Sequence, residues 1–315
     1  MAPSSETSPG GEGGGNVSRE SEGLRELAPW DPDQLLVDRY RVRDCVRQSS
    51  TCQLFRVQDV FRGTYRLVLR PSPRTVTKEG WREWFAEFCR NALAVPPHPN
   101  VVTCERMTEE GGLPFLIMED VEGRGWDSLI SDRTLSDLAQ MLDIALQTAQ
   151  GLAWLHRHDR IHYNFKPGNV LVSRSGVSKV WKYGEPGAKT RAYASPEQLA
   201  GDQTLTCATD VWSWAVSVLH MFVGRVVWKS GADAPKALLR YMQTGPAESR
   251  ISLMPGPVAR LLSKCFKNSP DERLIAMETV AETLEGTLGH SEAASQPKDA
   301  PAGPASAQGS DAPRP

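Results

Sequence analysis

The sequence predicts an α+β fold in which a small sheet is followed by a larger helical part. In the first third of the globular region, hydrophobic residues alternate with polar ones, as they do in half-buried strands. From Leu135 onward, helical patterns dominate as far as Leu288. No internal repeat is present, so solenoids and propellers are excluded.

The first part is expected to contain strands and one helix. Turns at 48–50 and 61–64 separate the first three strands, and Gly111-Gly112 joins the last two. A helix with hydrophobic residues on one face ends at the prolines that follow it. The expected strands are 40–46, 54–57, 65–69, 101–107 and 114–119, and the expected helix is 81–94.

The second part is expected to be helical. The triplet His156-Arg157-His158 lies at the end of a long helix, where we expect a solvated cap rather than a metal-binding pair. The expected helices are 135–158, 195–201, 209–224, 233–243, 258–266 and 275–288.

Both ends of the chain have the composition of disordered segments. The N-terminal segment is rich in Gly, Ser and Glu, and the C-terminal segment is rich in Ala and Pro with no larger hydrophobic residue. Such segments bury too little apolar surface to offset the entropy of ordering. We therefore expect a disordered tail over 1–35, one domain over 36–288 and a second disordered tail over 289–315.

The charge balance argues against several kinds of partner. The chain has 36 Lys+Arg and 38 Asp+Glu, so we expect no nucleic-acid partner. No run approaches the ~18 apolar residues of a membrane-spanning helix. Residues 1–28 lack the basic start and apolar middle of a signal peptide. We therefore expect a cytoplasmic protein without a membrane partner; its oligomeric state stays open.

The cysteines indicate neither disulfides nor a structural metal site. They are widely spaced, with no CxxC pair and no Cys/His spacing typical of zinc. Reduced thiols in a cytosol are expected. The six residues are Cys45, Cys52, Cys89, Cys104, Cys207 and Cys265.

The stretch from Ile161 to Val172, I-H-Y-N-F-K-P-G-N-V-L-V, resembles the catalytic loop of eukaryotic-type Ser/Thr protein kinases, H-R-D-L-K-P-x-N. Other kinase motifs have counterparts in the same order. They are His98-Pro99-Asn100 after the regulatory helix, Met118-Glu119-Asp120 at the hinge, Lys182-Tyr183-Gly184 at D-F-G, Ala194-Ser195-Pro196-Glu197 at A-P-E, Asp210 and Arg273. The resemblance spans Tyr40 to Leu288 and is bacterial in style. It implies a bilobal protein-kinase-like fold, with an N-lobe over 36–118, a hinge over 119–123 and a C-lobe over 124–288.

The residues that hold such a fold together are present. We expect Glu197 and Arg273 to form a buried bidentate ion pair. Asp210 is expected to accept backbone N–H bonds from His162 and Tyr163. The resemblance implies that Leu171 lies beneath an adenine, and that His162 and Tyr183 continue an apolar column through the C-lobe.

The residues that would move a phosphoryl group are largely replaced. Asn164 stands where the family has the aspartate that accepts the substrate proton, and an amide is no base. Lys182 stands where the family has the metal-binding aspartate, so we expect no Mg²⁺. A misaligned motif is the alternative, with Glu119, Asp159 and Glu185 as the nearby acids. Three active-site residues of the family are retained, namely Lys166, Asn169 and Thr190.

The glycine-rich flap is also altered. Placing Leu54 after the flap puts Arg47, Ser49 and Cys52 at the three glycine positions, so the backbone is not expected to close over phosphates.

The third strand carries further changes. Leu67-Val68-Leu69-Arg70 stands for V-A-I-K, so Arg70 is expected to replace the phosphate-binding lysine and Val68 the alanine beneath the adenine. We expect Glu87 to be the helix partner of Arg70. With Met118, Asn169, Leu171 and Lys182, these residues form the expected vestigial nucleotide cleft.

The activation segment from Glu185 to Lys189 is too short for a phosphorylated substrate-docking loop. Tyr163 replaces the arginine that would receive the phosphate, so switching by loop phosphorylation is not expected.

These observations favour a catalytically inactive protein-kinase-like domain, a pseudokinase, that binds a protein partner such as an active kinase and requires no cofactor. Two alternatives stay open. The first is a metal-independent nucleotide or anion sensor, because Asn164 and Lys182 together make the cleft more positive by three units than two aspartates would. The second is a weakly active Ser/Thr kinase that uses ATP.

Overall fold

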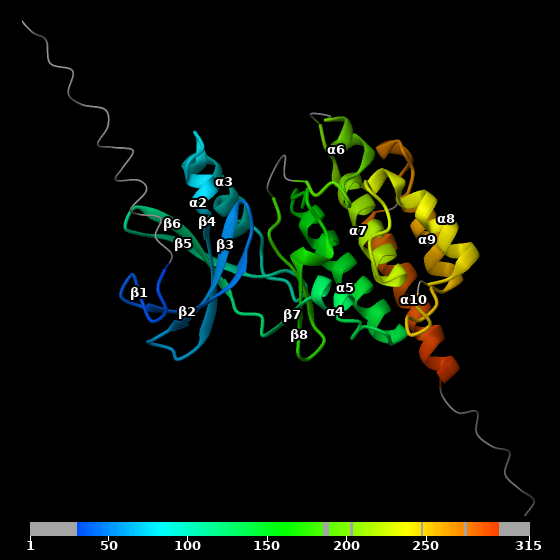
Figure 1. The fold of residues 1–315 in the computed structure, drawn as a ribbon, viewed down its shortest axis with the longest axis horizontal. Helices are drawn as coiled ribbons and strands as arrows, with labels where there is room; N and C mark the ends of the chain where they lie inside the picture. The colour runs from blue at the N-terminus through cyan, green and yellow to red at the C-terminus, as the bar shows by residue number, and fades with distance from the viewer. Residues whose placement is uncertain (1–29, 185–188, 202–203, 247, 274–275, 296–315) are drawn as a thin grey trace, which may run out of the picture.

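The computed structural model describes residues 30–184, 189–201, 204–246, 248–273 and 276–295. Within these ranges the chain forms two lobes, a sheet lobe and a helical lobe (Figure 1). The kinase-like, bilobal α+β fold expected from the sequence is therefore confirmed. The predicted tails cover 1–35 and 289–315; their parts 1–29 and 296–315 lie outside the described residues, as does the segment 185–188. Residues 289–295 are not a tail but continue the last helix, α10 (Met277–Ser295).

The N-lobe is built on a six-stranded antiparallel sheet with the order β1-β2-β3-β4-β6-β5. A longer helix, α3, covers one face of this sheet by burying Phe85, Phe88, Cys89 and Ala92. The elements are β1 (Leu35–Leu36), β2 (Tyr40–Gln48), β3 (Cys52–Asp59), β4 (Tyr65–Pro71), α2 (Pro73–Val76), α3 (Trp81–Leu93), β5 (Cys104–Glu110) and β6 (Leu113–Glu119).

The two faces of this sheet belong to different hydrophobic clusters. Leu67 and Leu69 of β4 face the main cluster with α3, whereas Val68 belongs to a second cluster on the outer face. Trp30 closes the outer cluster, with its ring 5.0 Å from that of Phe55. Residues 30–35 thus pack with the lobe, ahead of the predicted start at Leu36, because one large indole covers the exposed side of the sheet.

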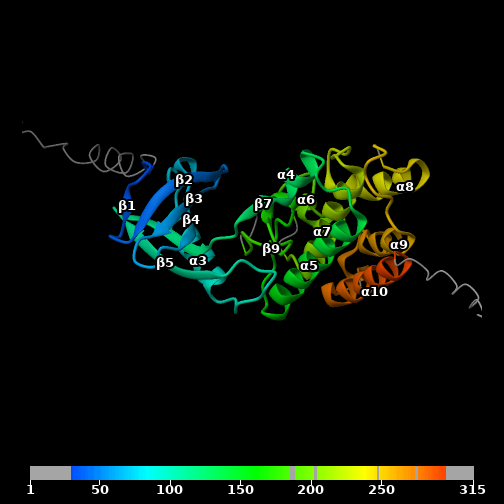
Figure 2. The same ribbon diagram turned by 90° about the horizontal axis from the view of Figure 1, so that it is seen from below.

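The C-lobe is helical, and its most deeply buried helix, α7, lies at its centre (Figure 2). A three-stranded sheet with the order β7-β8-β9 lies between the helices and the N-lobe. The elements are β7 (Gly123–Gly125), α4 (Trp126–Ser131), α5 (Leu138–Arg157), η1 (Pro167–Asn169), β8 (Val170–Ser173), β9 (Ser178–Val180), α6 (Pro196–Ala200), α7 (Cys207–Val223), η2 (Gly231–Asp233), α8 (Ala234–Thr244), α9 (Gly256–Cys265), η3 (Pro270–Glu272) and α10 (Met277–Ser295).

Capping side chains set where the helices begin. Asp137 accepts from the N–H of Gln140, so α5 starts at Leu138 rather than at the predicted Leu135. Ser195 and Gln198 form a reciprocal capping box at the start of α6. Within the residues that the structure describes, no helix has the length and hydrophobicity needed to cross a membrane.

Candidate functional site

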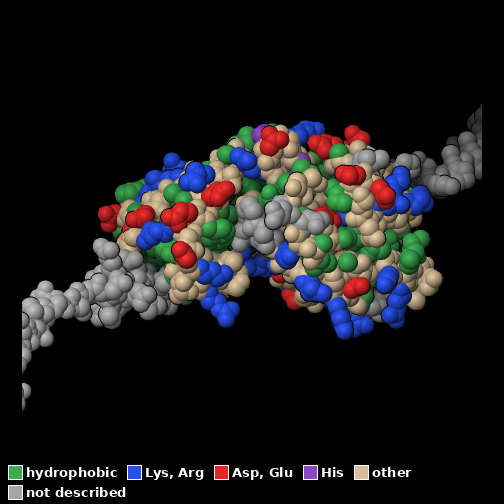
Figure 3. Space-filling view, turned by 90° about the horizontal axis from the view of Figure 1, so that it is seen from above, with side chains coloured by type: hydrophobic (Ala, Val, Ile, Leu, Met, Phe, Trp, Pro, Cys, Tyr) green, Lys and Arg blue, Asp and Glu red, His purple; other side chains and the backbone are tan. Residues whose placement is uncertain are grey.

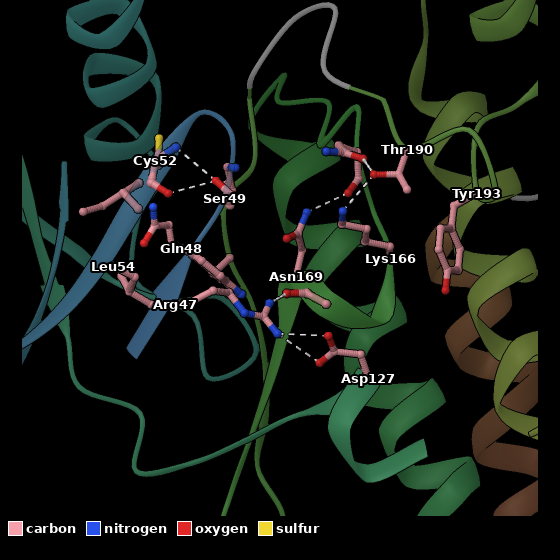
Figure 4. A pocket seen from close by; sticks show the side chains of 15 residues that line it. Arg47, Gln48, Ser49, Cys52, Leu54, Asp127, Lys166, Asn169, Thr190 and Tyr193 are labelled. Carbon is pink, nitrogen blue, oxygen red and sulfur yellow. Dashed lines mark hydrogen bonds and ion pairs between the residues drawn. The ribbon is translucent and has the colours of Figure 1, made fainter. Parts of the chain in front are cut away.

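A cleft lies between the β2–β3 hairpin and the C-lobe, and it consists of two adjoining cavities. We call them the inner cavity, of about 440 Å³, and the outer cavity, of about 490 Å³. Arg47, Leu54 and Trp181 line both cavities and therefore mark the boundary between them. The inner cavity brings together most of the residues that the sequence analysis singled out: Arg47, Ser49, Cys52, Asn164, Lys166, Asn169, Lys182 and Thr190 (Figure 4).

Asp210 at the start of α7 fixes the loop that leads into the inner cavity. Its two carboxylate oxygens accept the backbone N–H groups of His162 and Tyr163, at 2.7 and 3.0 Å. Tyr163 has a φ of 66°, a left-handed conformation that costs about 1–3 kcal/mol for a non-glycine residue. The predicted contact of Asp210 with this loop is thus confirmed, and it holds a strained residue in place.

The same carboxylate also binds the ring of His156, which corrects the prediction of a solvated cap. Nε2 of His156 lies 2.9 Å from Oδ2 of Asp210, and the side chain of Asp210 is fully buried. Burial, the largest single effect on the His156 ring, disfavours its charged form, but the hydrogen bonds to Asp210 and Cys207 and the nearby charge of Asp210 together outweigh it and raise the pKa of His156 to about 10. The position of His156 near the end of a predicted helix does not show that α7 packs against its ring.

Asn164 forms hydrogen bonds with neighbouring residues of the protein. Its side-chain oxygen accepts from the hydroxyl of Thr190 at 2.9 Å, and Nζ of Lys166 donates to that same hydroxyl at 2.8 Å. The side-chain amide of Asn169 donates to the backbone carbonyl of Asn164 at 2.8 Å. Three residues of the loop, Asn164, Lys166 and Asn169, therefore form one hydrogen-bonded network with Thr190.

His162 lies beneath this network and is fully buried. Its Nδ1 accepts the N–H of Asn164 at 3.3 Å, and its Nε2 lies 3.1 Å from the carbonyl oxygen of Trp181. Burial lowers the pKa of His162, which matches a neutral ring that accepts at Nδ1 and donates at Nε2. Tyr183 is buried in the main cluster, and its hydroxyl donates to the carbonyl of Ala92 on α3 at 3.3 Å, so this contact is with the N-lobe and the apolar column through the C-lobe stays a prediction.

Lys182 extends from the C-lobe to the hairpin. Its Nζ donates to the hydroxyl of Thr51 at 2.9 Å, and its backbone has a φ of 57°. Thr51 lies in the turn between β2 and β3, where the kinase family has its glycine-rich flap. The ammonium group of Lys182 therefore contacts the β2–β3 turn across the cleft.

The flap itself uses its backbone donors internally. The hydroxyl of Ser49 accepts the N–H groups of Thr51 and Cys52, at 3.3 and 3.0 Å, and donates to the carbonyl of Cys52. These N–H groups are the kind that would cradle a phosphate in a glycine-rich loop. Ser49 thus occupies donors that an open flap would offer to a ligand.

Arg47 makes the main contact between the lobes at this site. Its guanidinium donates to the carbonyl oxygen of Gly168 and to both carboxylate oxygens of Asp127, at 3.1 and 3.0 Å (Figure 4). Asp127 stands in the first turn of α4, a short helix that the sequence analysis did not predict. The sequence analysis aligned Arg47 with a glycine of the flap and named no partner for it; the partner lies on the other lobe, far along the chain.

The predicted role of Arg70 is wrong because the side chains of β4 alternate between the two faces of the sheet. Arg70 points to the outer face, where its guanidinium lies 4.5 Å from the ring centroid of Trp30 and 5.0 Å from that of Phe55. Its Nε donates to Gln53 at 3.0 Å, and burial lowers its pKa to about 10. Leu69, one residue earlier, lines the inner cavity instead.

The other N-lobe residues that were predicted to line the nucleotide cleft also lie elsewhere. Val68 lies on the outer face of the sheet and not in the cleft. Leu67 lines the outer cavity instead, together with Leu171. Of these predicted cleft residues, only Leu171 is found where it was expected. Glu87 is exposed on α3 and does not meet Arg70 on the other face of the sheet. Met118 is buried in the main cluster and is not among the residues that line either cavity.

The predicted ion pair between Glu197 and Arg273 is confirmed. The two guanidinium nitrogens lie 2.6 and 2.8 Å from the two carboxylate oxygens, and both side chains are buried. Burial, the largest single effect, would raise the pKa of Glu197, but the hydrogen bonds and charge of Arg273 together with hydrogen bonds at the start of α6 outweigh it and lower that pKa. The pair ties the start of α6 to the segment that precedes α10.

The lining of the inner cavity does not fit Mg²⁺. That ion favours carboxylate and phosphate oxygens, whereas Asn164 offers an amide and Lys182 an ammonium group. Among the described lining residues, Asp127 is the single carboxylate, and Arg47 holds it. Nor do the described residues contain a cluster of three or more His, Cys, Asp or Glu that suits a metal ion.

With this geometry in place, the family of the chain can be stated. The family model of the protein kinase domain matches residues 77–284, which is more than half of the chain. The chain therefore belongs to the protein kinase family.

Its relatives among curated proteins include bacterial kinases. A probable serine/threonine-protein kinase of Clostridium acetobutylicum is 23% identical over 257 residues, covering 76% of this chain and 38% of the relative. The serine/threonine-protein kinase PknA of Corynebacterium glutamicum is 32% identical over 147 residues, covering 42% of this chain and 31% of the relative. The chain thus spans well under half the length of these relatives.

Solved structures agree on the fold. The PknI kinase domain of Mycobacterium tuberculosis matches with a TM-score of 0.61 and 18% identity, covering 82% of this chain and 99% of that domain. At this identity, the likeness shows the fold alone.

Proposed function

We propose that the chain is a catalytically inactive protein-kinase-like domain that serves as a protein-binding, regulatory scaffold in signalling. The proposal rests on the contacts of Asn164 and Lys182, the two residues that align with the base and the metal-binding aspartate of active kinases. Asn164 accepts from Thr190 inside a hydrogen-bonded network, and Lys182 donates to Thr51 of the flap. Phosphoryl transfer depends on a positioned base and on metal-bound phosphates. An amide and an ammonium group supply neither of these functions.

The bridge formed by Arg47 supports the same proposal. Because Arg47 reaches Gly168 and Asp127 between the two cavities, a nucleotide that spans both cavities has to displace it. No cofactor is needed for such a domain, and its partner would be a protein, such as an active kinase. Cytoplasmic action is part of this proposal.

Phosphotransfer measurements test the proposal directly. The purified chain, its Lys166→Ala variant and an active bacterial Ser/Thr kinase are incubated with radiolabelled ATP, Mg²⁺ or Mn²⁺, and generic protein substrates. The expected result is labelling by the active kinase alone. Labelling by the wild-type chain that Lys166→Ala abolishes would overturn the proposal and favour the weakly active kinase.

A second candidate function, a metal-independent nucleotide or anion sensor, is favoured by the charge of the inner cavity. Three cationic side chains, Arg47, Lys166 and Lys182, line it with the single described carboxylate, Asp127. Such a site attracts an anion without a metal ion. A rise in melting temperature with millimolar ATP in EDTA would support this function; the scaffold proposal expects no rise.

A further inference from the structure

A second concave surface lies at the end of the C-lobe that is remote from the N-lobe sheet (Figure 2). This groove, of about 320 Å³, lies between the end of α7, the segment that follows it and α8. We call it the α8 groove. Its lining residues are Val223, Arg225, Val227, Ala237, Arg240, Tyr241, Thr244, Gly245 and Pro246.

The region around the α8 groove exposes an unusual share of hydrophobic side chains. Of the eleven large hydrophobic residues that are exposed in the described parts of the chain, five lie between residues 226 and 253. An exposed hydrophobic concentration of this kind marks interaction surfaces in folded proteins. The five are Val226, Val227, Leu239, Met242 and Leu253.

The walls of the groove are held in place by packing. The hydroxyl of Tyr241 accepts the N–H of Met254 at 2.9 Å, which ties the segment after α8 to that helix. Gly224 has a φ of 83°, and a Cβ there would lie 2.4 Å from Cδ1 of Ile251. The groove is therefore a preformed feature rather than a gap between loose segments.

Within the part of the chain that the structure describes, the basic side chains around the groove form no ion pair. Arg225 and Arg240 line it, and neither forms an ion pair with any residue that the structure describes. The same holds, within those residues, for Lys229, Lys236 and Arg250 nearby. Arginines elsewhere do find carboxylates, such as Arg39 with Asp59. Figure 3 shows basic and hydrophobic side chains next to one another over this end of the C-lobe.

We propose that the α8 groove binds an acidic segment of a partner protein. An apolar side chain of that segment packs against Val223, Ala237 and Tyr241, and flanking carboxylates meet the guanidinium groups of Arg225 and Arg240. Guanidinium groups bind carboxylates bidentately, which gives such a contact direction as well as charge. The inference goes beyond the proposed function, since the groove shares no lining residue with the cleft.

Peptide binding to the full chain tests the proposal. Fluorescence anisotropy is measured with a labelled peptide that has Glu or Asp on both sides of two Leu, and with the same peptide carrying Gln in place of the acids. The chain is used as wild type, as the double variant Arg225→Glu/Arg240→Glu, and as Arg62→Glu. Arg62 is an exposed N-lobe arginine, so Arg62→Glu reverses one charge far from the groove, half of the change made by the double variant.

The expected result is that the wild type and Arg62→Glu bind the acidic peptide alike, while the double variant binds it at least tenfold more weakly. The Gln peptide is expected to bind weakly to all three. No binding by the wild type, or equal loss in Arg62→Glu, would overturn the proposal. So would binding of an RNA homopolymer as tight as that of the peptide, because it would indicate a general polyanion surface. Far-UV circular dichroism verifies that each variant is folded, and none of these outcomes depends on phosphotransfer.

Discussion

Asp210 shows how much one side chain can organise. Its carboxylate accepts two backbone N–H groups of the loop and binds the ring of His156, all within a fully buried site. A buried carboxylate needs such partners, because an unpaired charge is costly inside a protein. The backbone contacts could be expected from the sequence motif, whereas the His156 contact required the packing of α5 against α7.

The raised pKa of His156 leads to a pH-dependent contribution to stability. Because the folded pKa of about 10 exceeds the unfolded value of 6.5, the contribution is fully present below pH 6.5 and is lost as the pH rises towards 10. We expect the free energies of unfolding of the wild type and His156→Gln to differ most at pH 6 and to converge by pH 10. Urea unfolding at pH 6, 8 and 10 measures this difference. A difference that stays constant over the range would contradict the assignment.

Arg70 shows at the same scale why a motif can mislead. The motif V-A-I-K placed a cation in the cleft, but the side chains of a strand alternate, and a shift of one residue reverses every face. The pairing of Leu69 with Leu54 and with Leu116 sets the observed register. Leu69 consequently lines the inner cavity, and Arg70 lies between aromatic rings outside it.

At the scale of elements, the β2–β3 hairpin is the part that distinguishes this cleft. Its turn is anchored within the N-lobe by the hydroxyls of Ser72 and Thr75, which donate to the carbonyls of Ser50 and Thr51 at 2.7 Å each. Arg47 anchors the same hairpin to the C-lobe. A flap that is held on both sides lacks the freedom to close over phosphates.

Releasing Arg47 is expected to favour nucleotide binding. Asp127→Asn removes the ion pair but keeps both side-chain sizes. A partly exposed pair of this kind contributes about 0.2–1 kcal/mol, so the ATP binding that the sensor alternative expects should strengthen a few-fold. Isothermal titration of ATP in the presence of EDTA measures the change.

Arg43→Ala serves as the control for that experiment. It removes another exposed ion pair of β2, the one with Asp33, which lies outside both cavities. ATP affinity that is unchanged or lower in Asp127→Asn, or that rises equally in Arg43→Ala, would show that Arg47 does not restrict the cleft.

At the scale of the molecule, the pair Glu197–Arg273 joins distant parts of the C-lobe. Arg273 also donates to the backbone carbonyls of Lys267, Asn268 and Ala208. All these contacts converge on one buried guanidinium, so a single substitution affects α6, α7 and the segment before α10 together.

Removing one partner of this pair should be strongly destabilising. Glu197→Ala leaves the Arg273 charge buried without its carboxylate, which costs about 3–5 kcal/mol. Glu278→Ala removes the exposed pair with Arg157 and should cost under about 1 kcal/mol. Urea unfolding of both variants at pH 7 measures these losses in free energy, and similar losses in the two would contradict the structural role of the buried pair.

The sequence by itself determined the two-lobe fold, the long elements and the presence of Asn164 and Lys182 in the cleft, because hydrophobic periodicity and ordered motifs are local properties of the chain. The tertiary structure decided the rest: which face Arg70 takes, that Arg47 meets Asp127, and that His156 binds Asp210. Each of these depends on a strand register or on a partner that is distant along the chain, and no local pattern specifies such contacts.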